Sequence, residues 1–310
     1  MYKNFVSRHA PVQANARQSS PRGFQAFFGK AQNFLLPAAL TCAALAASSV
    51  EVGASDAEVP SKINAVYSIA FNGFNIGSFR FESEVKGSTY VLNGDAELSA
   101  LLGAIKWRGV SRSAGTIHKD GPQPSGYSLN FNGNARSGSV KVGFGEGNVT
   151  SASIIPPFMI ASDEVPLKRQ HLKDALDPLS AVMALTFGAA RKPCDQKLAI
   201  FDGKQRFDLA LSYRGKRAQS GFPGQSGGKK TAIICAVRYK PLGGFRPTGE
   251  TTHLAKSNDI EIAMLPVPSA NIAIPQQVTI PTSYGHVVLS AEKISVENGR
   301  RRDVALLNGY

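Results

Sequence analysis

The sequence predicts a mainly β protein, in which an antiparallel curved sheet or partly open β-barrel wraps around one buried helix. Two observations support this fold. Many short runs alternate apolar with polar residues, the pattern of half-buried strands, and Gly, Asn and Asp turn residues separate these runs. One segment, near residues 177–188, has helical spacing instead and almost no polar face, so we expect it to be buried.

The first strands begin soon after residue 60. Ala65, Tyr67, Ile69 and Phe71 would share one face of a strand, and Asn72-Gly73 then favours a tight hairpin turn. The next strand is expected at residues 76–85, and another begins at Tyr90. Further strands are expected at residues 105–117, 126–131, 139–144 and 149–155. Short strands at such regular spacing predict an antiparallel sheet or barrel.

The predicted helix begins at Asp177-Pro178, because Asp is a good N-cap and Pro is favoured at the first helical position. Leu179, Val182, Met183 and Phe187 follow at helical spacing, and Gly188 is a suitable end. A single buried helix among many strands indicates a curved sheet wrapped around it.

The second half returns to strands, expected at residues 197–201, 207–213, 231–239, 259–265 and 285–296. A loop rich in Gly and Lys is expected from Gly215 to Lys230. The Pro-rich stretch at residues 266–281 predicts an extended connection or an edge strand, because Pro cannot donate to a ladder of hydrogen bonds.

The N-terminal stretch has the order of an export signal: a basic lead, an apolar run from Phe34 to Val50, and small residues at Val52-Gly53-Ala54. We therefore expect residues 1–54 to be a signal peptide and residues 55–310 to be a single β-rich periplasmic domain. An uncleaved membrane anchor is the alternative. Cys42 raises a lipoprotein option, but Ala39-Leu40-Thr41 is a poor match to the usual lead-in.

The chain is basic, with a formal net charge of +13. Loss of the signal peptide would remove five basic residues and one acidic residue, leaving +9. An exported protein does not meet the genome, so no nucleic-acid partner is expected. The charge favours either peripheral contact with an anionic membrane surface or simply a solvated basic surface.

Two cysteines, Cys194 and Cys235, remain after the predicted signal peptide. An even pair in an oxidising compartment predicts a structural disulfide. Two free buried thiols are the alternative, whereas the absence of a Cys-x-x-Cys motif makes a redox-active pair the weakest interpretation.

No motif in the sequence carries a strong catalytic signal, so we expect no enzymatic activity, no metal and no cofactor. Residues 224–228 match the Gly-x-Ser-x-Gly pattern of hydrolases around Ser226, but the strand and helix that this motif needs are not expected on either side. The four histidines after the signal are far apart, at positions 118, 171, 253 and 286, and give no metal-binding spacing.

Trp107 stands between Lys106 and Arg108 and has two interpretations. It could grip a headgroup or a sugar through stacking and cation–π contact. It could equally be an inward-facing residue on a strand whose charged neighbours face solvent, and the alternation favours this second interpretation.

Several segments together resemble a known family. They are residues 67–77, 177–181 (Asp-Pro-Leu-Ser-Ala), 200–204 (Ile-Phe-Asp-Gly-Lys), 206–209 and 239–245, together with Cys194 and Cys235. In this order they resemble the proteobacterial envelope family known as domain of unknown function 3108, over most of residues 60–295. The resemblance implies an exported β protein, and this family offers no assigned catalytic residues to carry over.

We therefore expect a non-catalytic periplasmic protein that binds a lipid or acyl ligand, or otherwise supports the envelope. An apolar groove is expected between helix and sheet, near Val182, Met183, Phe187 and Trp107. The partner would be a lipid, a lipoprotein or another envelope component. A ligand-free protein–protein scaffold is the first alternative, and a hydrolase acting through Ser226 is a minor one.

Overall fold

The computed structural model describes residues 59–100, 103–159, 161–188, 192–219, 230–298 and 301–306. The expected signal peptide, Cys42 and the loop that carries Ser226 lie outside the described residues. All the elements below belong to one compact unit of the chain.

Fourteen strands form one antiparallel sheet. Its first half contains β1 (Lys62–Phe71), β2 (Phe74–Lys86), β3 (Thr89–Ala100), β4 (Ile105–His118), β5 (Gly121–Gly133), β6 (Gly138–Gly145) and β7 (Asn148–Ile155). Its second half contains β8 (Lys197–Phe201), β9 (Arg206–Gln219), β10 (Lys230–Gly243), β11 (Glu261–Val267), β12 (Ile272–Thr282), β13 (Gly285–Asn298) and β14 (Arg301–Leu306). Helix α1 (Pro178–Gly188) stands between the two halves in sequence.

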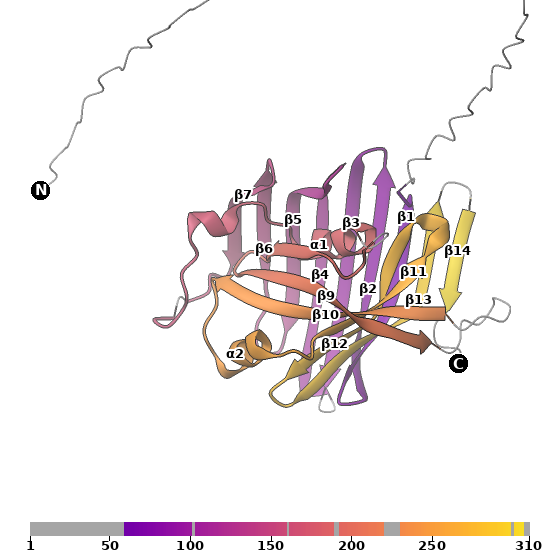
Figure 1. Cartoon of the computed structure of the whole chain (residues 1–310). Coiled ribbons are helices and arrows are strands. Elements are labelled where there is room, and N and C mark those ends of the chain that lie inside the picture. The colour runs from indigo at the N-terminus through magenta and orange to yellow at the C-terminus, as the bar shows by residue number, and fades with distance from the viewer. Residues whose placement is uncertain are drawn as a thin grey trace, which may run out of the picture. The chain divides into compact units, whose positions relative to one another are not determined.

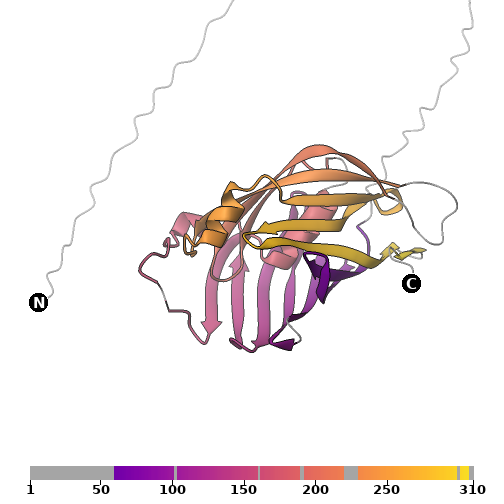
Figure 2. The same cartoon turned by 90° about the horizontal axis from the view of Figure 1, so that it is seen from below.

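The strand order is β7-β6-β5-β4-β3-β2-β1-β13-β12-β11-β10-β9-β8, and β14 also pairs with β13. The sheet therefore ends in β7 on one side and β8 on the other, and it does not close into a barrel. Its two halves lie over one another as two layers, with α1 between them (Figures 1 and 2). The expectation of a curved, open antiparallel sheet around one buried helix is confirmed.

Alternation determines which face of each strand is buried. In β1, Ile63, Ala65 and Tyr67 are buried and the residues between them are half-exposed. The β1–β2 turn is the tight turn expected from the sequence, since Asn72 and Gly73 both have positive φ angles, of 49° and 86°. Gly tolerates this conformation without strain, and Asn tolerates it better than most residues.

The prediction for the Pro-rich stretch is wrong. Most of it forms β12, which lies inside the sheet between β11 and β13. Pro275 is accommodated where the register between β11 and β12 shifts, and Pro281 lies near the hairpin turn. Both are places where a missing N–H costs little.

Several short elements were not expected from the sequence. They are α2 (Gly249–Lys256), the 3₁₀ turns η2 (Arg169–Leu172) and η3 (Pro268–Ala270), and β14. Helix α2 begins at Thr248, whose side chain accepts a hydrogen bond from the Thr251 backbone N–H. Among the described residues, no helix is long and apolar enough to cross a membrane.

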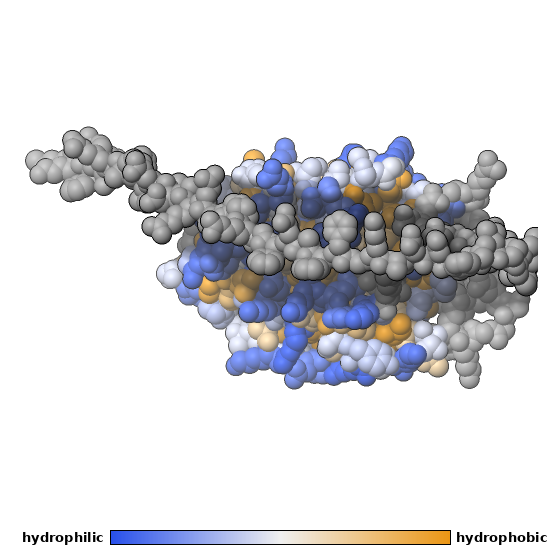
Figure 3. Space-filling view, turned by 45° about the horizontal axis from the view of Figure 1, so that its top comes forward, coloured by the Kyte–Doolittle hydropathy of each residue, from blue (hydrophilic) through white to orange (hydrophobic). Residues whose placement is uncertain are grey.

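The segment before α1 spans the space between the two edge strands. The Ala175 N–H donates to the Gly147 carbonyl at the β6–β7 turn, at 3.0 Å. Leu176 then pairs with β8, donating to Ala199 and accepting from Phe201, both at 2.8 Å. These three backbone hydrogen bonds fix the chain just before the start of α1, between the layers. Figure 3 shows one face of this unit, on which hydrophilic side chains surround separate hydrophobic patches.

Candidate functional site

Helix α1 begins where the sequence predicted. The Asp177 carboxylate accepts hydrogen bonds from the backbone N–H groups of Leu179 and Ser180, at 2.9 and 3.1 Å, as an N-cap does. The helix approaches β3 closely because Gly94 has no side chain. A Cβ at Gly94 would lie only 3.0 Å from the Leu179 side chain.

A buried polar cluster surrounds this helix start. The second Asp177 oxygen accepts hydrogen bonds from the hydroxyls of Ser113, at 2.8 Å, and of Ser180. The Ser180 hydroxyl also lies 2.8 Å from the Tyr90 hydroxyl and 3.0 Å from that of Ser113. All four side chains are buried. Strands β3 and β4 thus hold the N-terminus of α1 through hydrogen bonds.

The electrostatics of the cluster follow from its burial. Desolvation raises the pKa of the Asp177 carboxyl above its ordinary value, although hydrogen bonds from Ser180, Ser113 and Leu179 work in the opposite direction. Burial likewise raises the pKa of Tyr90. Ser113 and Ser180 are each at most 1% exposed, so neither hydroxyl faces a space that a substrate could enter. We interpret the cluster as a structural anchor for α1.

An apolar cavity of about 270 Å³ lies beside the same helix. The residues that line it are all aliphatic, aromatic or Pro. They come from α1 (Pro178, Ala181, Val182, Leu185), from β1 and β2 (Tyr67, Phe79, Phe81), from β8 and β9 (Leu198, Ile200, Phe207, Leu209) and from β11 to β13 (Ile262, Pro275, Val278, Leu289). The Tyr67 hydroxyl donates to the Pro275 carbonyl at 2.8 Å, so even this polar group is already satisfied.

The cavity lies where two hydrophobic cores meet. Leu179 and Met183 of α1 belong to the core formed with the first half of the sheet, β12 and β13. Ala181 and Leu185, on another side of the helix, belong to the core formed by β8 to β12. The side chains of both cores border the cavity but do not fill it. Ligand pockets in proteins start at about 300 Å³, so this volume suits one small apolar group or part of a chain rather than a whole lipid.

The structure separates the residues expected to form the groove. Val182 lines the cavity, whereas Met183 is 1% exposed and packs inside the first core. Phe187 is half-buried and packs against that same core. Trp107 is half-buried near the start of β4. Its ring lies over Gly109 and Gly133, where an added Cβ would come within 2.3 and 3.1 Å of it. Its strand also borders a separate groove of about 780 Å³, which polar side chains such as Glu97 line.

Sequence reasoning missed most of the cavity wall. Phe79, Phe207, Leu209, Val278 and Leu289 line the cavity and are only partly buried. Alternation could place each of them on an inward face, but it could not show that the faces of strands far apart in sequence meet around one space.

The expected disulfide is present in the structure. Cys194 and Cys235 are bonded, with their Cα atoms 5.1 Å apart. The bond joins the segment before β8 to β10, and both residues lie in the second core beside Leu185 and Leu198. It therefore ties together the part of the sheet that forms one wall of the cavity.

The segment 200–204 forms a turn that packs against the opposite layer. Asp202 accepts hydrogen bonds from the backbone N–H groups of Lys204 and Gln205, at 2.8 and 2.6 Å, and burial raises the pKa of its carboxyl. Gly203 has a φ of 100°, and a Cβ there would lie 2.3 Å from the Val140 side chain. Only Gly fits this contact between the β8–β9 turn and β6.

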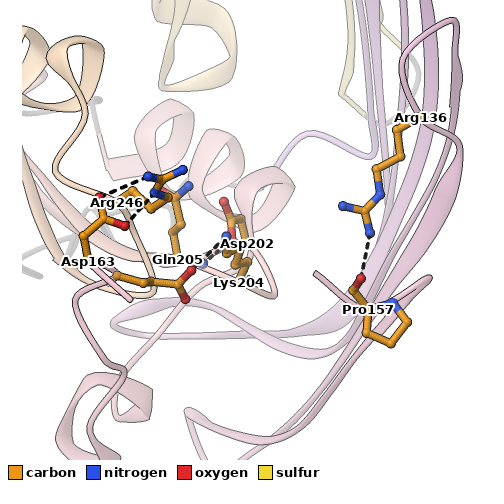
Figure 4. A network of polar contacts seen from close by, with 8 residues as sticks. Arg136, Pro157, Asp163, Asp202, Lys204, Gln205 and Arg246 are labelled. Carbon is orange, nitrogen blue, oxygen red and sulfur yellow. Dashed lines mark hydrogen bonds and ion pairs between the residues drawn. The ribbon is translucent and has the colours of Figure 1, made fainter. Parts of the chain in front are cut away.

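Charged pairs surround this turn (Figure 4). Arg246 binds Asp163 through two hydrogen bonds of 2.8 and 3.1 Å, and Lys204 lies 3.3 Å from Glu164. The cations of Lys204 and Arg136 also lie over the ring of Phe158, at 4.7 and 3.8 Å from its centroid. Every cation of this group has a partner, so the network fastens the 156–176 segment rather than presenting a free charged site.

The remaining titratable residues give no sign of a metal centre. Within the described ranges, no group of three or more His, Cys, Asp or Glu side chains is placed to hold a metal ion. His118, for example, lies 2.9 Å from the Thr116 hydroxyl.

Together, the fold and the cavity define a class of protein: a curved antiparallel sheet that encloses a helix and leaves an apolar cavity beside it. Residues 66–292 match the family model described as a protein of unknown function (DUF3108), and the chain belongs to this family. No curated protein matches the chain. The resemblance inferred from segments 177–181, 200–204 and 239–245 is thus confirmed at the level of the family.

Proposed function

We propose that this protein is a non-catalytic binding protein of the bacterial cell envelope that holds part of an acyl chain, or a similarly small apolar part of a lipid ligand, in the cavity beside α1. The observation that carries the proposal is the cavity itself. Protein interiors are normally packed to the density of organic crystals, so an unfilled apolar space between two well-formed cores calls for an occupant.

The chemistry of the wall supports an apolar ligand. A cavity lined by aliphatic and aromatic side chains offers no hydrogen bonds, so water gains little there, and apolar cavities of this kind bind apolar molecules. Because Tyr67 donates to Pro275, no lining hydroxyl is free to select a polar headgroup. We expect recognition by shape and hydrophobicity, with the headgroup of the ligand outside.

The sequence supports a place outside the cytoplasm. The basic, apolar and small-residue order of residues 1–54 is typical of an export signal, and a structural disulfide is typical of an oxidising compartment. The proposed location is the periplasm.

The experiment measures binding of a fluorescent C16 fatty acid analogue to the purified exported protein and to two variants, Val182→Trp and Leu289→Trp. Both replacements fill the cavity, one from the helix and one from the sheet. Val110→Trp is the matched control, since Val110 is 46% exposed and lies outside the cavity. We expect affinity to fall at least tenfold in both cavity variants and to stay within twofold in the control.

Two results would contradict the proposal. If both cavity variants remain folded and bind the analogue normally, the cavity is not the binding site. If the exported protein neither binds the analogue nor yields a lipid on solvent extraction and mass spectrometry, a ligand-free scaffold becomes the better function.

A further inference from the structure

Three hairpin turns at one end of the sheet present large apolar side chains to solvent. Phe74 is the first residue of β2, Ile105 is the first residue of β4, and Tyr284 lies just before β13. Their exposed fractions are 77%, 52% and 84%. Single exposed apolar residues are common on protein surfaces, but three at neighbouring turns form a pattern.

Pairing of the strands puts these turns side by side. The order β4-β3-β2-β1-β13-β12 makes the β3–β4, β1–β2 and β12–β13 hairpins neighbours, and all three turn at the same end (Figure 1, lower edge). Asn72 ties two of them together, because its side-chain amide donates to the Tyr284 carbonyl at 3.1 Å and accepts from the His286 N–H at 2.9 Å. Phe74 and Ile105, two strands apart, are about 10 Å apart.

The hairpin turns at this end carry no acidic side chain. Residues 72–76, 99–108, 132–138 and 281–286, which make up these turns and the β5–β6 turn, contain no Asp or Glu. They contain Lys106, Arg108 and Arg136. Arg108 pairs with Asp95 at 2.9 Å and with Glu97 at 3.2 Å, and Arg136 is held by the Phe158 ring and the Pro157 carbonyl. Lys106 is therefore the cation of these turns that has no ion pair among the described residues. Glu250 of α2 accepts from the Ser283 N–H at 3.1 Å.

The opposite end of the same strands differs in both respects. Its turns, at residues 86–88, 119–120 and 146–147, carry Asp120 and Glu146 as well as Lys86 and Lys119. None of these described turn residues is a large exposed hydrophobic. Of the two ends of these strands, only one therefore combines large exposed hydrophobic side chains with turns that contain no Asp or Glu.

We propose that the rim, defined as Phe74, Ile105 and Tyr284 with Lys106, docks the protein on a bilayer surface that contains anionic lipids. Aromatic and aliphatic side chains enter the headgroup region while Lys106 meets the lipid phosphates. A rigid sheet presents the three side chains at fixed spacing, so little ordering is needed on contact. The inference goes beyond ligand binding in the cavity and does not depend on it.

The experiment is co-sedimentation of the exported protein with phosphatidylcholine vesicles and with vesicles of phosphatidylcholine and phosphatidylglycerol at 7:3. The rim variant replaces Phe74, Ile105 and Tyr284 by Ser. The matched control replaces Val110, Leu167 and Tyr213 by Ser, because these residues are also exposed, at 46%, 39% and 62%, and none belongs to the three hairpin turns. We expect binding to the anionic vesicles to fall at least tenfold in the rim variant and to stay within twofold in the control.

Two further measurements locate the contact. Lys106→Glu should weaken binding to anionic vesicles without changing the weaker binding to neutral ones. Trp107, the one tryptophan of the chain, is two residues from Ile105, so its fluorescence should be quenched by lipids that carry a quencher near the headgroup. Vesicles should quench it in the wild type and not in the rim variant.

Several outcomes would overturn the proposal. They are no binding of the wild type to the anionic vesicles, equal losses in the rim variant and the control, or full binding by a folded rim variant. A loss on replacing Arg300, Arg301 and Arg302 by Ala, with the rim intact, would place the lipid contact elsewhere. Val182→Trp should still bind vesicles, which separates failure of this inference from failure of the cavity as a ligand site.

Discussion

The two sides of α1 show how differently one helix can be used. On the side of β3 and β4, Leu179, Ser180 and Met183 are all at most 4% exposed, and none of them lines the cavity beside α1. On the side of β8, β9 and β11 to β13, Ala181, Val182 and Leu185 border an unfilled space. The same short helix is anchored by hydrogen bonds on one side and borders a cavity on the other.

This difference between the two sides of α1 indicates that the cavity does not arise from a loosely held helix. Asp177, Ser113, Ser180 and Tyr90 anchor α1 to strands that are far away in sequence, and every carboxylate oxygen in this cluster accepts a hydrogen bond. We expect these hydrogen bonds to hold the first turn of α1 in place beside the cavity.

The strongest test of this contrast compares truncations on the two sides. Met183→Ala should lower the free energy of unfolding by about 2–5 kcal/mol, because it leaves a new void in a full core. Val182→Ala, which only enlarges an existing space, should cost about 1 kcal/mol or less. Urea denaturation of both variants measures the two losses, and equal losses would show that the two sides are packed alike.

The core on the cavity side contains a covalent bond as well as packed side chains. Replacing Cys194 and Cys235 together by Ala should lower the free energy of unfolding by about 2–4 kcal/mol, since the bond closes a loop across 41 residues. Denaturation of the variant, with and without a reducing agent, measures this loss. The reducing agent should destabilise the wild type and leave the variant unchanged. If it leaves the stability of the wild type unchanged too, the disulfide is not formed in the protein.

The anchor itself can be removed at one residue. Asp177→Ala takes away the N-cap and leaves the hydroxyls of Ser113 and Ser180 without their shared acceptor, so we expect a loss of about 2–3 kcal/mol. Asp195→Ala is the control, because Asp195 is exposed and its ion pair with Lys192 is a surface one. The idea of an anchor fails if thermal unfolding shows the same small change in both variants.

Local patterns explain why much of this fold could be predicted. Asp177-Pro178 and Gly188 mark the ends of α1, and β8 has the predicted bounds Lys197–Phe201, because caps, turns and alternation act within a few residues. The anchor and the cavity could not be predicted in the same way. Ser113 is 64 residues from Asp177, and Phe79 and Leu289 meet the same space from opposite ends of the chain. Only the three-dimensional path of the sheet decides such contacts.

The smallest expected effect concerns the charge of the anchor. Burial raises the pKa of Asp177 above the ordinary value of 3.8, so the folded protein holds this proton more tightly than the unfolded chain. Folding then binds a proton between the two pKa values, and the free energy of unfolding must fall as the pH rises from about 4 through the folded pKa. Asp177→Asn keeps an N-cap but cannot titrate.

The stability of the wild type relative to Asp177→Asn should therefore decrease as the pH rises above about 4, as measured by urea denaturation at a series of pH values. Asp202, whose pKa burial also raises, is present in both proteins, so its contribution cancels in the difference. A difference that stays constant or increases with pH would mean that hydrogen bonds from Ser113, Ser180 and Leu179 outweigh desolvation. The cluster would then favour the ionised carboxylate, and the anchor would be strongest above pH 4 rather than below it.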